Sequence, residues 1–323
     1  MTEFHLIDEI RARLGRRGNR VLIGSGDDAA VTRCDGVTVT TVDAFVEGVH
    51  FRLATTSMHD LGHKCVAAAT SDIAAMGALP GEVYIALGLP EHLDSEEVLD
   101  LAEGAEALAS ELGFTICGGD ISRSHELFIA VTATGHAGNE RELVTRAGAK
   151  PGDRLGVTGA LGGAAAGLVV LERKLGGLDR QTGEALLARQ LRPWPLIESG
   201  RALAAAGVDA MIDVSDGIAT DAGHLAERSG ASLDIQLAEL PLAPGVEAVA
   251  RAAGRDPLEL AASGGDDYEL LFTASPDRRD TVESMARSAG TSVTWVGSVS
   301  SGTGARLIGA DGRPVELSGY EHP

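Results

Sequence analysis

Six short acidic motifs along the chain carry the residue types that are best suited to holding a hard cation. Carboxylates, hydroxyls and backbone carbonyls are the ligands that Mg²⁺ prefers in proteins. In each motif one or two aspartates stand beside small or hydroxyl-bearing residues: Gly26-Asp27-Asp28, Thr41-Val42-Asp43, Ser71-Asp72, Gly118-Gly119-Asp120, Asp213-Val214-Ser215-Asp216 and Gly264-Gly265-Asp266-Asp267. These motifs together predict a site for divalent cations.

Each motif also has an ordinary structural explanation when it is taken alone. An Asp beside Gly is common in turns, and Ser215 or Asp216 could simply cap the following helix. Asp72 could face solvent or be neutralised by Lys64, which lies two turns earlier in the same predicted helix. A metal site is favoured because the same context recurs along the chain, and because an unpaired carboxylate on a helix of small residues is costly.

Strand ends provide a second reason to expect a ligand site. Asp43, Asp120 and Asp213 each follow a stretch that has the pattern of a strand. Loops converge at strand ends in α/β proteins, and ligand sites commonly form there. Asp213 and Asp216 are three residues apart at a predicted helix start, so they can face the same way. Free N–H groups at that helix start would favour a phosphate.

The elements that must position these motifs are strands and helices, mixed in both halves of the chain. An Ala-rich helix over residues 62–81 carries Asp72. A polar stretch at 138–153 separates two expected domains, 1–140 and 141–323, so the fold class is α/β or α+β in two lobes. We expect further helices at 94–112, 160–175, 182–191, 196–206, 217–230 and 276–289, and strands at 37–45, 83–89, 114–120, 127–135, 154–159, 210–217, 292–299 and 304–309.

The composition limits the classes of partner. A net charge of −20 argues against binding to nucleic acid or to an anionic membrane surface. No stretch approaches the length of a membrane span, and the first residues have the pattern of an amphipathic helix rather than a signal peptide. The three cysteines, Cys34, Cys65 and Cys117, lack CxxC spacing and are expected to be buried free thiols. We expect a cytoplasmic protein.

Several familiar nucleotide-binding and hydrolase motifs are missing from the sequence. There is no GxxxxGK[ST] phosphate loop, no GxGxxG, no protein-kinase signature, no GxSxG and no HExxH. A P-loop enzyme, a protein kinase and an α/β-hydrolase are therefore disfavoured.

Taken in order, the acidic motifs and their neighbours resemble those of thiamine-monophosphate kinase. This family belongs to a superfamily with aminoimidazole ribonucleotide synthetase, selenophosphate synthetase and the E-type hydrogenase maturation protein. The resemblance runs nearly from end to end and is carried by GDDAAV at 26–31, VDAFVEGVHF at 42–51, GHKCVAAATSDIAAMGA at 62–78, GGDISRS at 118–124, LVTRAGAKPGD at 143–153, DVSDGIATDAGH at 213–224, GGDDYELLFT at 264–273 and GYEH at 319–322.

The resemblance implies a fold and a reaction. The fold would be the two-domain aminoimidazole ribonucleotide synthetase-like fold, an α/β N-terminal domain that forms a homodimer through a β-barrel and an α+β C-terminal domain. The reaction would convert ATP and thiamine monophosphate into ADP and thiamine diphosphate, the last step of thiamine diphosphate biosynthesis, with several Mg²⁺ ions between the domains.

The resemblance also implies roles for individual residues. It places Mg²⁺ on Asp28, Thr41, the carbonyl of Val42, Asp43, Asp72, Asp120, Asp213 and Asp216. It places the ATP phosphates near Gly119, Asp120, Arg146 and Ser215, and thiamine monophosphate near His50, Asp266 and Tyr320. The residues expected to carry the catalysis are Asp43, Asp120, Arg146 and Asp213.

Two departures from the family pattern affect these roles. Val42 stands where the family often has a second Thr, so only its carbonyl could bind a metal. Asp266 stands where the family commonly has Glu, so its carboxylate reaches one methylene less far toward a thiamine ring.

Two alternatives remain from the sequence. Another ATP-dependent synthetase of the superfamily is possible, although relatives that use a reactive Cys on a terminal segment fit poorly, since no Cys precedes Cys34 and the sequence ends in Glu321-His322-Pro323. The second alternative is a non-catalytic acidic protein that binds cations or nucleotides. Turnover of Mg-ATP and thiamine monophosphate would separate that alternative from an enzyme.

Overall fold

The computed structural model describes all residues except 1–2, 16, 25–28, 174–177, 318 and 320–323. The chain forms two compact units. The N-terminal unit comprises Met1–Ile73 and Ala78–Glu140, and the C-terminal unit comprises Ala74–Gly77 and Arg141–Pro323. None of the described helices is long and apolar enough to cross a lipid bilayer.

A four-stranded sheet forms the centre of the N-terminal unit. Its strands follow the order β3 (Val37–Val46), β6 (Phe128–Ala137), β4 (Leu79–Leu89) and β5 (Thr115–Arg123). β3 and β6 pair antiparallel without a break over ten residues each, whereas β4 and β5 are parallel. β1 (Val21–Ile23) and β2 (Val31–Thr32) form a separate two-stranded sheet.

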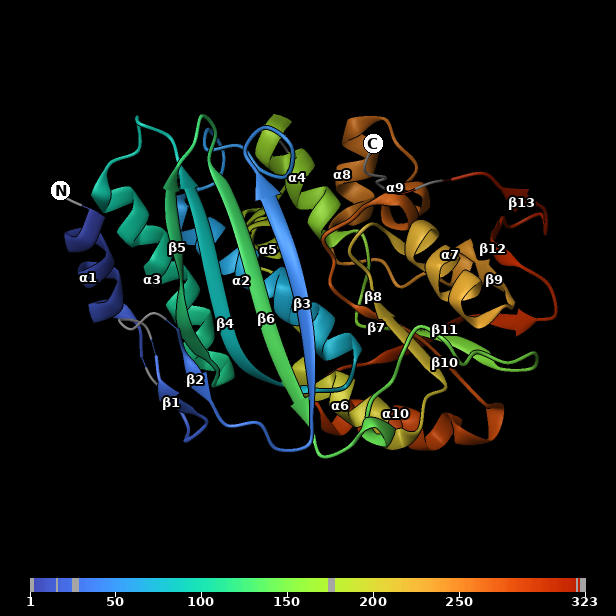
Figure 1. Ribbon diagram of the computed structural model, residues 1–323. Helices are drawn as coiled ribbons and strands as arrows, with labels where there is room; N and C mark the ends of the chain where they lie inside the picture. The colour runs from blue at the N-terminus through green and yellow to red at the C-terminus, as the bar shows by residue number, and fades with distance from the viewer. Residues whose placement is uncertain (1–2, 16, 25–28, 174–177, 318, 320–323) are drawn as a thin grey trace. The chain divides into compact units, whose positions relative to one another are not determined.

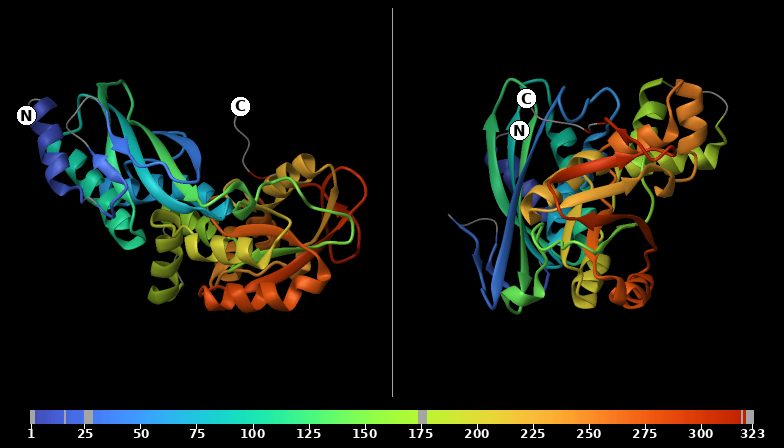
Figure 2. Two further views of the ribbon diagram at one scale, coloured as in Figure 1. Left: turned by 60° about the horizontal axis from the view of Figure 1, so that its bottom comes forward. Right: turned by 90° about the vertical axis from the view of Figure 1, so that its right-hand side faces the viewer.

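Helices cover one face of this sheet. α2 (Met58–Ala75) and α3 (Ser95–Leu112) lie against it, and α1 (Glu3–Arg13) packs beside α3 (Figure 1). Figure 2 shows the same layering from two other sides. α2 and α3 approach each other closely at two glycines. A Cβ added to Gly62 of α2 would lie 2.0 Å from the Leu101 carbonyl oxygen, and a Cβ added to Gly104 of α3 would lie 1.9 Å from the His59 carbonyl oxygen.

The ends of α3 follow directly from the sequence. Asp94 accepts a hydrogen bond from the Glu97 N–H, and the Glu97 side chain accepts one from the Asp94 N–H, which completes a capping box. Gly113 ends the helix in a left-handed conformation at φ 78°. The predicted helix over 94–112 is confirmed, as is the buried face of α2 formed by Leu61, Cys65, Ala69 and Ile73.

Three predictions in this unit differ from the structure. β3 ends within one residue of the predicted 37–45, but Asp43 lies inside it and does not follow it, and β5 runs through Gly119 and Asp120 instead of turning there. Both strands continue because acidic side chains leave the backbone free to pair: Asp43 pairs with Val131, and Asp120 with Ala86. The helix expected over 62–81 spans Met58–Ala75, and residues 79–81 begin β4.

The sheet of the N-terminal unit is open in the single chain. No closed barrel occurs among the residues that the structure describes, because β3 and β5 form the two edges. On the face opposite α2, alternate residues of β3 are exposed, and the side chain of Val42 is 64% exposed. Phe128 on β6 is also exposed.

A seven-stranded sheet forms the centre of the C-terminal unit. Its neighbouring strands are antiparallel except β12 and β9, which are parallel. In spatial order they are β13 (Pro314–Val315), β12 (Gly304–Ile308), β9 (Ser232–Gln236), β11 (Val293–Ser300), β7 (Arg154–Thr158), β10 (Leu270–Ala274) and β8 (Ala210–Asp213).

Both faces of this sheet are buried, because successive strand residues point to opposite sides. Leu271 and Ile212 enter one core together with residues of α7 (Ile218–Ser229) and α9 (Pro257–Ser263). Phe272 and Met211 enter the other core with α6 (Ile197–Ala206) and α10 (Arg279–Ser288). Burying each large side chain contributes about 1.5–3 kcal/mol. The remaining helices are α4 (Gly163–Arg173), α5 (Arg180–Leu191) and α8 (Val246–Ala253), with 3₁₀ turns at Glu140–Glu142, Leu237–Glu239 and Pro276–Arg278.

The cysteines follow the prediction in part. Cys65 and Cys117 are buried free thiols, as expected, whereas Cys34 is free but exposed. Cys34 lies in the segment before β3, where its sulfur is 3.6 Å from the Thr38 hydroxyl.

Candidate active site

Two of the predicted metal-binding carboxylates lie together in the N-terminal unit. Thr41 and Asp43 are on β3, and Asp72 is on α2, where the Thr41 hydroxyl donates a hydrogen bond to the Asp72 carboxylate at 2.5 Å. Burial, together with the negative charge of Asp72, raises the pKa of Asp43 to about 7. The structure therefore holds two like charges near each other in a partly desolvated place, where a cation would relieve their repulsion.

One hydroxyl and two carboxylates form a set of donors that could hold Mg²⁺. Mg²⁺ usually keeps several waters and uses one or two carboxylates together with substrate phosphates. No three His, Cys, Asp or Glu side chains gather into a metal cluster within the described part of the chain. Asp28, which the sequence assigns to the same ions, lies outside the described residues.

Two further predicted residues are placed near the end of β3. Val42 points its side chain into solvent, so its carbonyl is its only possible metal ligand. His50 is held in the turn after β3, where its Nδ1 accepts a hydrogen bond from the Val46 N–H at 3.0 Å and its ring packs edge-on against Phe45. A neutral ring with this contact carries its proton on Nε2.

Gly119 and Asp120 lie at the opposite edge of the same sheet from Asp43. Asp43 pairs with Val131, Val131 with Ile85, and Ile85 with Gly119, so these residues share one row across the four strands. Three inter-strand spacings correspond to roughly 14 Å. Asp120 is exposed and accepts a hydrogen bond from the Ser122 hydroxyl at 3.2 Å. Within one chain, Asp43 and Asp120 cannot bind the same ion.

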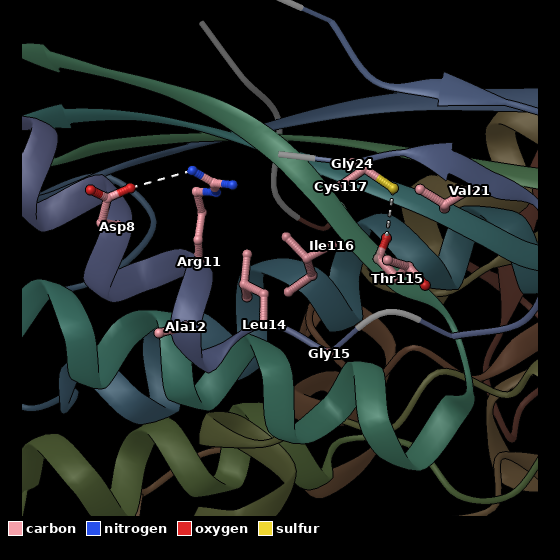
Figure 3. A pocket seen from close by; sticks show the side chains of 10 residues that line it. All are labelled: Asp8, Arg11, Ala12, Leu14, Gly15, Val21, Gly24, Thr115, Ile116 and Cys117. Atoms are coloured by element: carbon pink, nitrogen blue, oxygen red, sulfur yellow. Dashed lines mark hydrogen bonds and ion pairs between the residues drawn. The ribbon is translucent and has the colours of Figure 1, made fainter. Parts of the chain in front are cut away.

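Two adjoining pockets lie beside β5, under α1. One, of about 120 Å³, is lined by apolar side chains of α1 and α3 and continues to Gly118, Gly119 and Asp120. The other, of about 530 Å³, is bordered by Arg11, which forms an ion pair with Asp8, and by Thr115 and Cys117 of β5 (Figure 3). The Gly118-Gly119-Asp120 motif thus borders the smaller of the two pockets, a slot with apolar walls.

In the C-terminal unit, a tight loop carries the other predicted carboxylates. Asp213 ends β8, which stops four residues before the predicted end at 217, and it is 3% exposed; Ser215 and Asp216 follow it. Asp221, in the first turn of α7, accepts hydrogen bonds from the Ser215 N–H at 3.1 Å and the Asp216 N–H at 3.2 Å. Burial and the charges of Asp213 and Asp216 raise the pKa of Asp221 to about 8.

This geometry corrects two predictions about the start of α7. The helix begins at Ile218, and its N-cap is Gly217 at φ 102°, so neither Ser215 nor Asp216 caps it. The N–H groups of Ser215 and Asp216 are satisfied by Asp221 and are not open to a phosphate through these contacts. Asp221 was missed because an Asp in the first turn of a helix has a sufficient explanation in the helix dipole.

Arg146 is anchored beside α7 through its backbone. The Ser229 hydroxyl at the end of α7 donates to the Arg146 carbonyl at 3.0 Å and accepts from the N–H groups of Gly148 and Ala149. The side chain of Arg146 is exposed, and its positive charge lowers the pKa of Asp221. The structure therefore brings the predicted guanidinium within electrostatic range of the acidic loop.

Asp266 lies in a strained loop that is attached to this acidic loop. Asp266 and Tyr268 have φ values of 65° and 51°, and they are the only non-glycine residues with positive φ in the described parts of the chain. The Asp266 N–H donates to the Ser215 carbonyl, and the Tyr268 N–H donates to the Val214 carbonyl, both at 2.8 Å. Asp213, Ser215, Asp216 and Asp266 are therefore neighbours.

The carboxylate of Asp266 has two side-chain donors that sequence reasoning missed. The Tyr268 hydroxyl donates to one oxygen at 3.0 Å, and the Gln190 amide of α5 donates to the other at 3.4 Å. A contact across 76 residues leaves no local signal in the sequence.

The chain near the closing motif also reaches this loop. The Gly319 N–H donates to the Thr220 hydroxyl at 2.9 Å, and a Cβ at Gly319 would lie 1.9 Å from the Asp216 carbonyl oxygen. Gly319 is therefore a position where close approach of two backbones leaves no room for a side chain. Its neighbour Tyr320 lies outside the described residues.

Comparison with known proteins defines the class to which this fold and site belong. Residues 26–137 match the N-terminal domain of AIR synthase related proteins, and residues 150–309 match the C-terminal domain of the same proteins. Curated thiamine-monophosphate kinases share 38% identity over 83% of this chain and 79% of the relative (Mycobacterium tuberculosis CDC 1551), and 34% identity over 99% of this chain and 98% of the relative (Escherichia coli K12). The chain belongs to the thiamine-monophosphate kinase family of enzymes.

Solved structures agree with this assignment. A thiamine-monophosphate kinase from Stenotrophomonas maltophilia K279a superposes with a TM-score of 0.84, 36% identity and 98% coverage of both chains. AaThiL complexed with AMPPCP and TMP superposes with a TM-score of 0.80 and 31% identity, covering 99% of this chain and 96% of the relative. The Escherichia coli hydrogenase maturation protein HypE, at 20% identity and a TM-score of 0.79, shares the fold alone.

Proposed function

We propose that this chain transfers the γ-phosphoryl group of ATP to thiamine monophosphate and releases ADP and thiamine diphosphate, the last step of thiamine diphosphate biosynthesis. The observation that carries the proposal is the match over 99% of the chain to AaThiL complexed with AMPPCP, a methylene analogue of ATP, and TMP. The acidic loops support it, because phosphoryl transfer needs cation-binding carboxylates rather than a covalent nucleophile. The cytoplasm remains the expected location of the protein, because ATP is abundant in the cytoplasm.

The chemistry requires positioning more than acid–base catalysis. The accepting phosphate has a second pKa of about 6, so near pH 7 it is mostly a dianion and needs no general base. The barrier lies in bringing two polyanions into line, and a protein of net charge −20 adds to that repulsion. Bound Mg²⁺ would supply most of the positive charge.

The metal ligands that we propose come from both units. Thr41, Asp43 and Asp72 would hold Mg²⁺ in the N-terminal unit, because the carboxylates are adjacent and Thr41 already orients Asp72. Asp213 and Asp216 would do so in the C-terminal unit, where Asp221 holds their loop. We also propose Asp28, Asp120 and the carbonyl of Val42 as ligands of Mg²⁺.

We propose that ATP lies along β5. Gly119 leaves the backbone uncovered by a side chain, and the neighbouring slot offers apolar walls of α1 and α3 to a purine ring. The residues that we propose for contacts with the phosphates are Gly119, Asp120, Arg146 and Ser215. Thiamine monophosphate would bind through His50, Asp266 and Tyr320.

A homodimer would explain why Asp43 and Asp120 lie at opposite edges of one sheet. We propose that two copies join their four-stranded sheets into one barrel, with β3 of one copy beside β5 of the other. The uncovered face of the sheet, with exposed Val42 and Phe128, supports this arrangement, since such a face would become the barrel interior. The edge strand that carries Asp43 in one copy would then adjoin the edge strand that carries Asp120 in its partner, although the two residues are roughly 14 Å apart within a chain.

Removing the guanidinium of Arg146 should affect turnover and leave folding intact. Arg146→Ala should lower kcat by about a hundredfold or more, because an arginine on the transferred phosphoryl group is worth at least that much. Its side chain is exposed, so Tm should stay within about 2 °C of wild type. Steady-state kinetics and thermal denaturation check this, with Arg228→Ala, exposed at the end of α7, as the matched control. Parallel losses of kcat and Tm would make Arg146 structural.

Removing the carboxylate of Asp266 should weaken binding of thiamine monophosphate selectively. Asp266→Ala should raise the KM for thiamine monophosphate by about tenfold to a hundredfold and change the KM for ATP less than twofold, since removing a charged contact costs roughly 1.5–3 kcal/mol. Initial rates with each substrate varied in turn measure both constants. A larger change in the KM for ATP would move Asp266 to the nucleotide site.

The direct test of the function is turnover by the purified chain. Incubation with Mg-ATP and thiamine monophosphate should yield thiamine diphosphate and ADP in equal amounts. Binding of ATP by the folded protein without any product would support the non-catalytic alternative instead.

A further inference from the structure

The carboxylate of Asp266 is held from two sides by buried neutral groups. The Tyr268 hydroxyl donates to Oδ1 at 3.0 Å, and the Gln190 Nε2 donates to Oδ2 at 3.4 Å. Tyr268 is 5% exposed and Gln190 is 6% exposed, so both donors belong to the packed interior. Because the donors are neutral, these contacts orient the carboxylate without cancelling its charge.

The loop that carries Asp266 is fixed independently of these side chains. Its backbone pairs with the Val214 and Ser215 carbonyls, and a Cβ at Gly265 would lie 2.4 Å from the Ser215 carbonyl oxygen. The left-handed conformations of Asp266 and Tyr268 turn the Tyr268 hydroxyl back toward the carboxylate two residues earlier. Residues kept in this region of φ are characteristic of functional sites.

Helix α5 brings Gln190 to this loop and holds it there. Arg189 donates to the Ala160 carbonyl at 3.0 Å and lies 3.7 Å from the buried Glu269 carboxylate. Gly167 of α4 lets α5 approach so closely that an added Cβ would lie 2.1 Å from the Leu186 carbonyl oxygen and 2.9 Å from the Gln190 Cβ. Packing of α5 against α4 therefore holds Gln190 in position independently of its hydrogen bond to Asp266.

We propose that Gln190 and Tyr268 are positioning residues that orient the Asp266 carboxylate toward the cationic part of thiamine monophosphate; this rests on the proposed function. Because the side chain of Asp266 is one methylene shorter than that of Glu, its carboxylate can contact the substrate over a smaller range of orientations, so the orientation of the carboxylate matters more. Two fixed donors set that direction. Gln190, 76 residues away in the chain, thus contributes to substrate preference without touching the substrate.

Removing either donor should weaken binding of thiamine monophosphate alone. Gln190→Met keeps most of the side-chain volume and Tyr268→Phe removes only a hydroxyl, so each should raise the KM for thiamine monophosphate about threefold to tenfold, the range expected for one lost hydrogen bond. The KM for ATP, kcat and Tm should change little. Gln181→Met, exposed on the same helix, is the matched control. Unchanged KM values in both variants, or equal changes for ATP, would overturn the proposal.

A double-mutant cycle distinguishes positioning from a general structural role. If Gln190 acts through Asp266, adding Gln190→Met to Asp266→Ala should raise the KM for thiamine monophosphate no further. Independent, multiplying effects of the two substitutions would contradict the proposal.

A crystal structure gives a readout that does not depend on activity. In the wild-type chain the Asp266 carboxylate should keep both donors, and in Gln190→Met it should rotate away from its wild-type direction. An unchanged carboxylate in the variant would overturn the positioning role even if the enzyme is active. Absence of turnover by the wild-type chain would refute the proposed function and leave this structural comparison in force.

Discussion

Asp43→Asn should remove at least about 99% of the phosphoryl-transfer activity, in line with the hundredfold or larger losses seen when a site loses one electrostatic contribution. Asn presents the same shape but no negative charge, so the pair with Asp72 can no longer hold Mg²⁺ strongly. The KM for Mg-ATP should rise together with the Mg²⁺ concentration needed for half-maximal rate. Initial rates over a Mg²⁺ series measure both effects.

The same substitution should stabilise the metal-free protein. The pKa of Asp43 is raised to about 7 by burial and by Asp72, so ionisation of Asp43 in the folded state costs stability. That cost is small near pH 4, grows as the pH rises through 7, and is constant above it. Without divalent cations, Asp43→Asn should therefore melt a few degrees higher than wild type at pH 8, and the difference should shrink toward pH 5. A lower Tm at pH 8 together with lost activity would show that Asp43 is needed for folding.

Asp120→Asn should cause a comparable loss of activity with no change in stability. Asp120 is exposed on β5 and accepts a hydrogen bond from the Ser122 hydroxyl, which Asn can also accept, so Tm should stay within about 1 °C. Glu126→Gln, exposed in the loop before β6, is the control of equal charge change. Near-wild-type turnover by Asp120→Asn would remove this residue from the metal and ATP site.

Mixing the two inactive variants tests the proposed dimer. If each site takes Asp43 from one copy and Asp120 from its partner, a heterodimer of the two variants contains one intact site, and activity should return on refolding them together. If every site lies within one chain, each site in the mixture keeps one substitution and the mixture stays inactive. Analytical ultracentrifugation of the mixture confirms that dimers formed.

The sequence predicted most clearly the features that depend on local rules. The capping box of Asp94 and Glu97 and the terminal Gly113 define α3, which agrees with the predicted helix over 94–112. The sequence was less informative about whether β3 and β5 end at their acidic motifs, because pairing with neighbouring strands determines their length. β3 and β5 continue through their acidic motifs because the side chains leave the sheet plane and the backbone keeps its partners.

Two parts of the site were missed, one through a local contact and one through a contact between distant segments. Asp221 binds the N–H groups of Ser215 and Asp216, which displaced the expected side-chain cap of α7. Gln190 reaches Asp266 only because α4 and α5 pack at Gly167. The Gln190 contact leaves no pattern along the chain, since it depends on which elements fold against each other, whereas Asp221 had a sufficient local explanation in the helix dipole.

The most direct measurement of the proposed reaction is ³¹P nuclear magnetic resonance of the chain with ATP, thiamine monophosphate and Mg²⁺, repeated with EDTA. Thiamine diphosphate and ADP signals should grow together at equal rates, and both should stop when EDTA removes the metal. Growth of inorganic phosphate in place of thiamine diphosphate, or product formation that EDTA leaves unchanged, would contradict metal-dependent transfer to thiamine monophosphate.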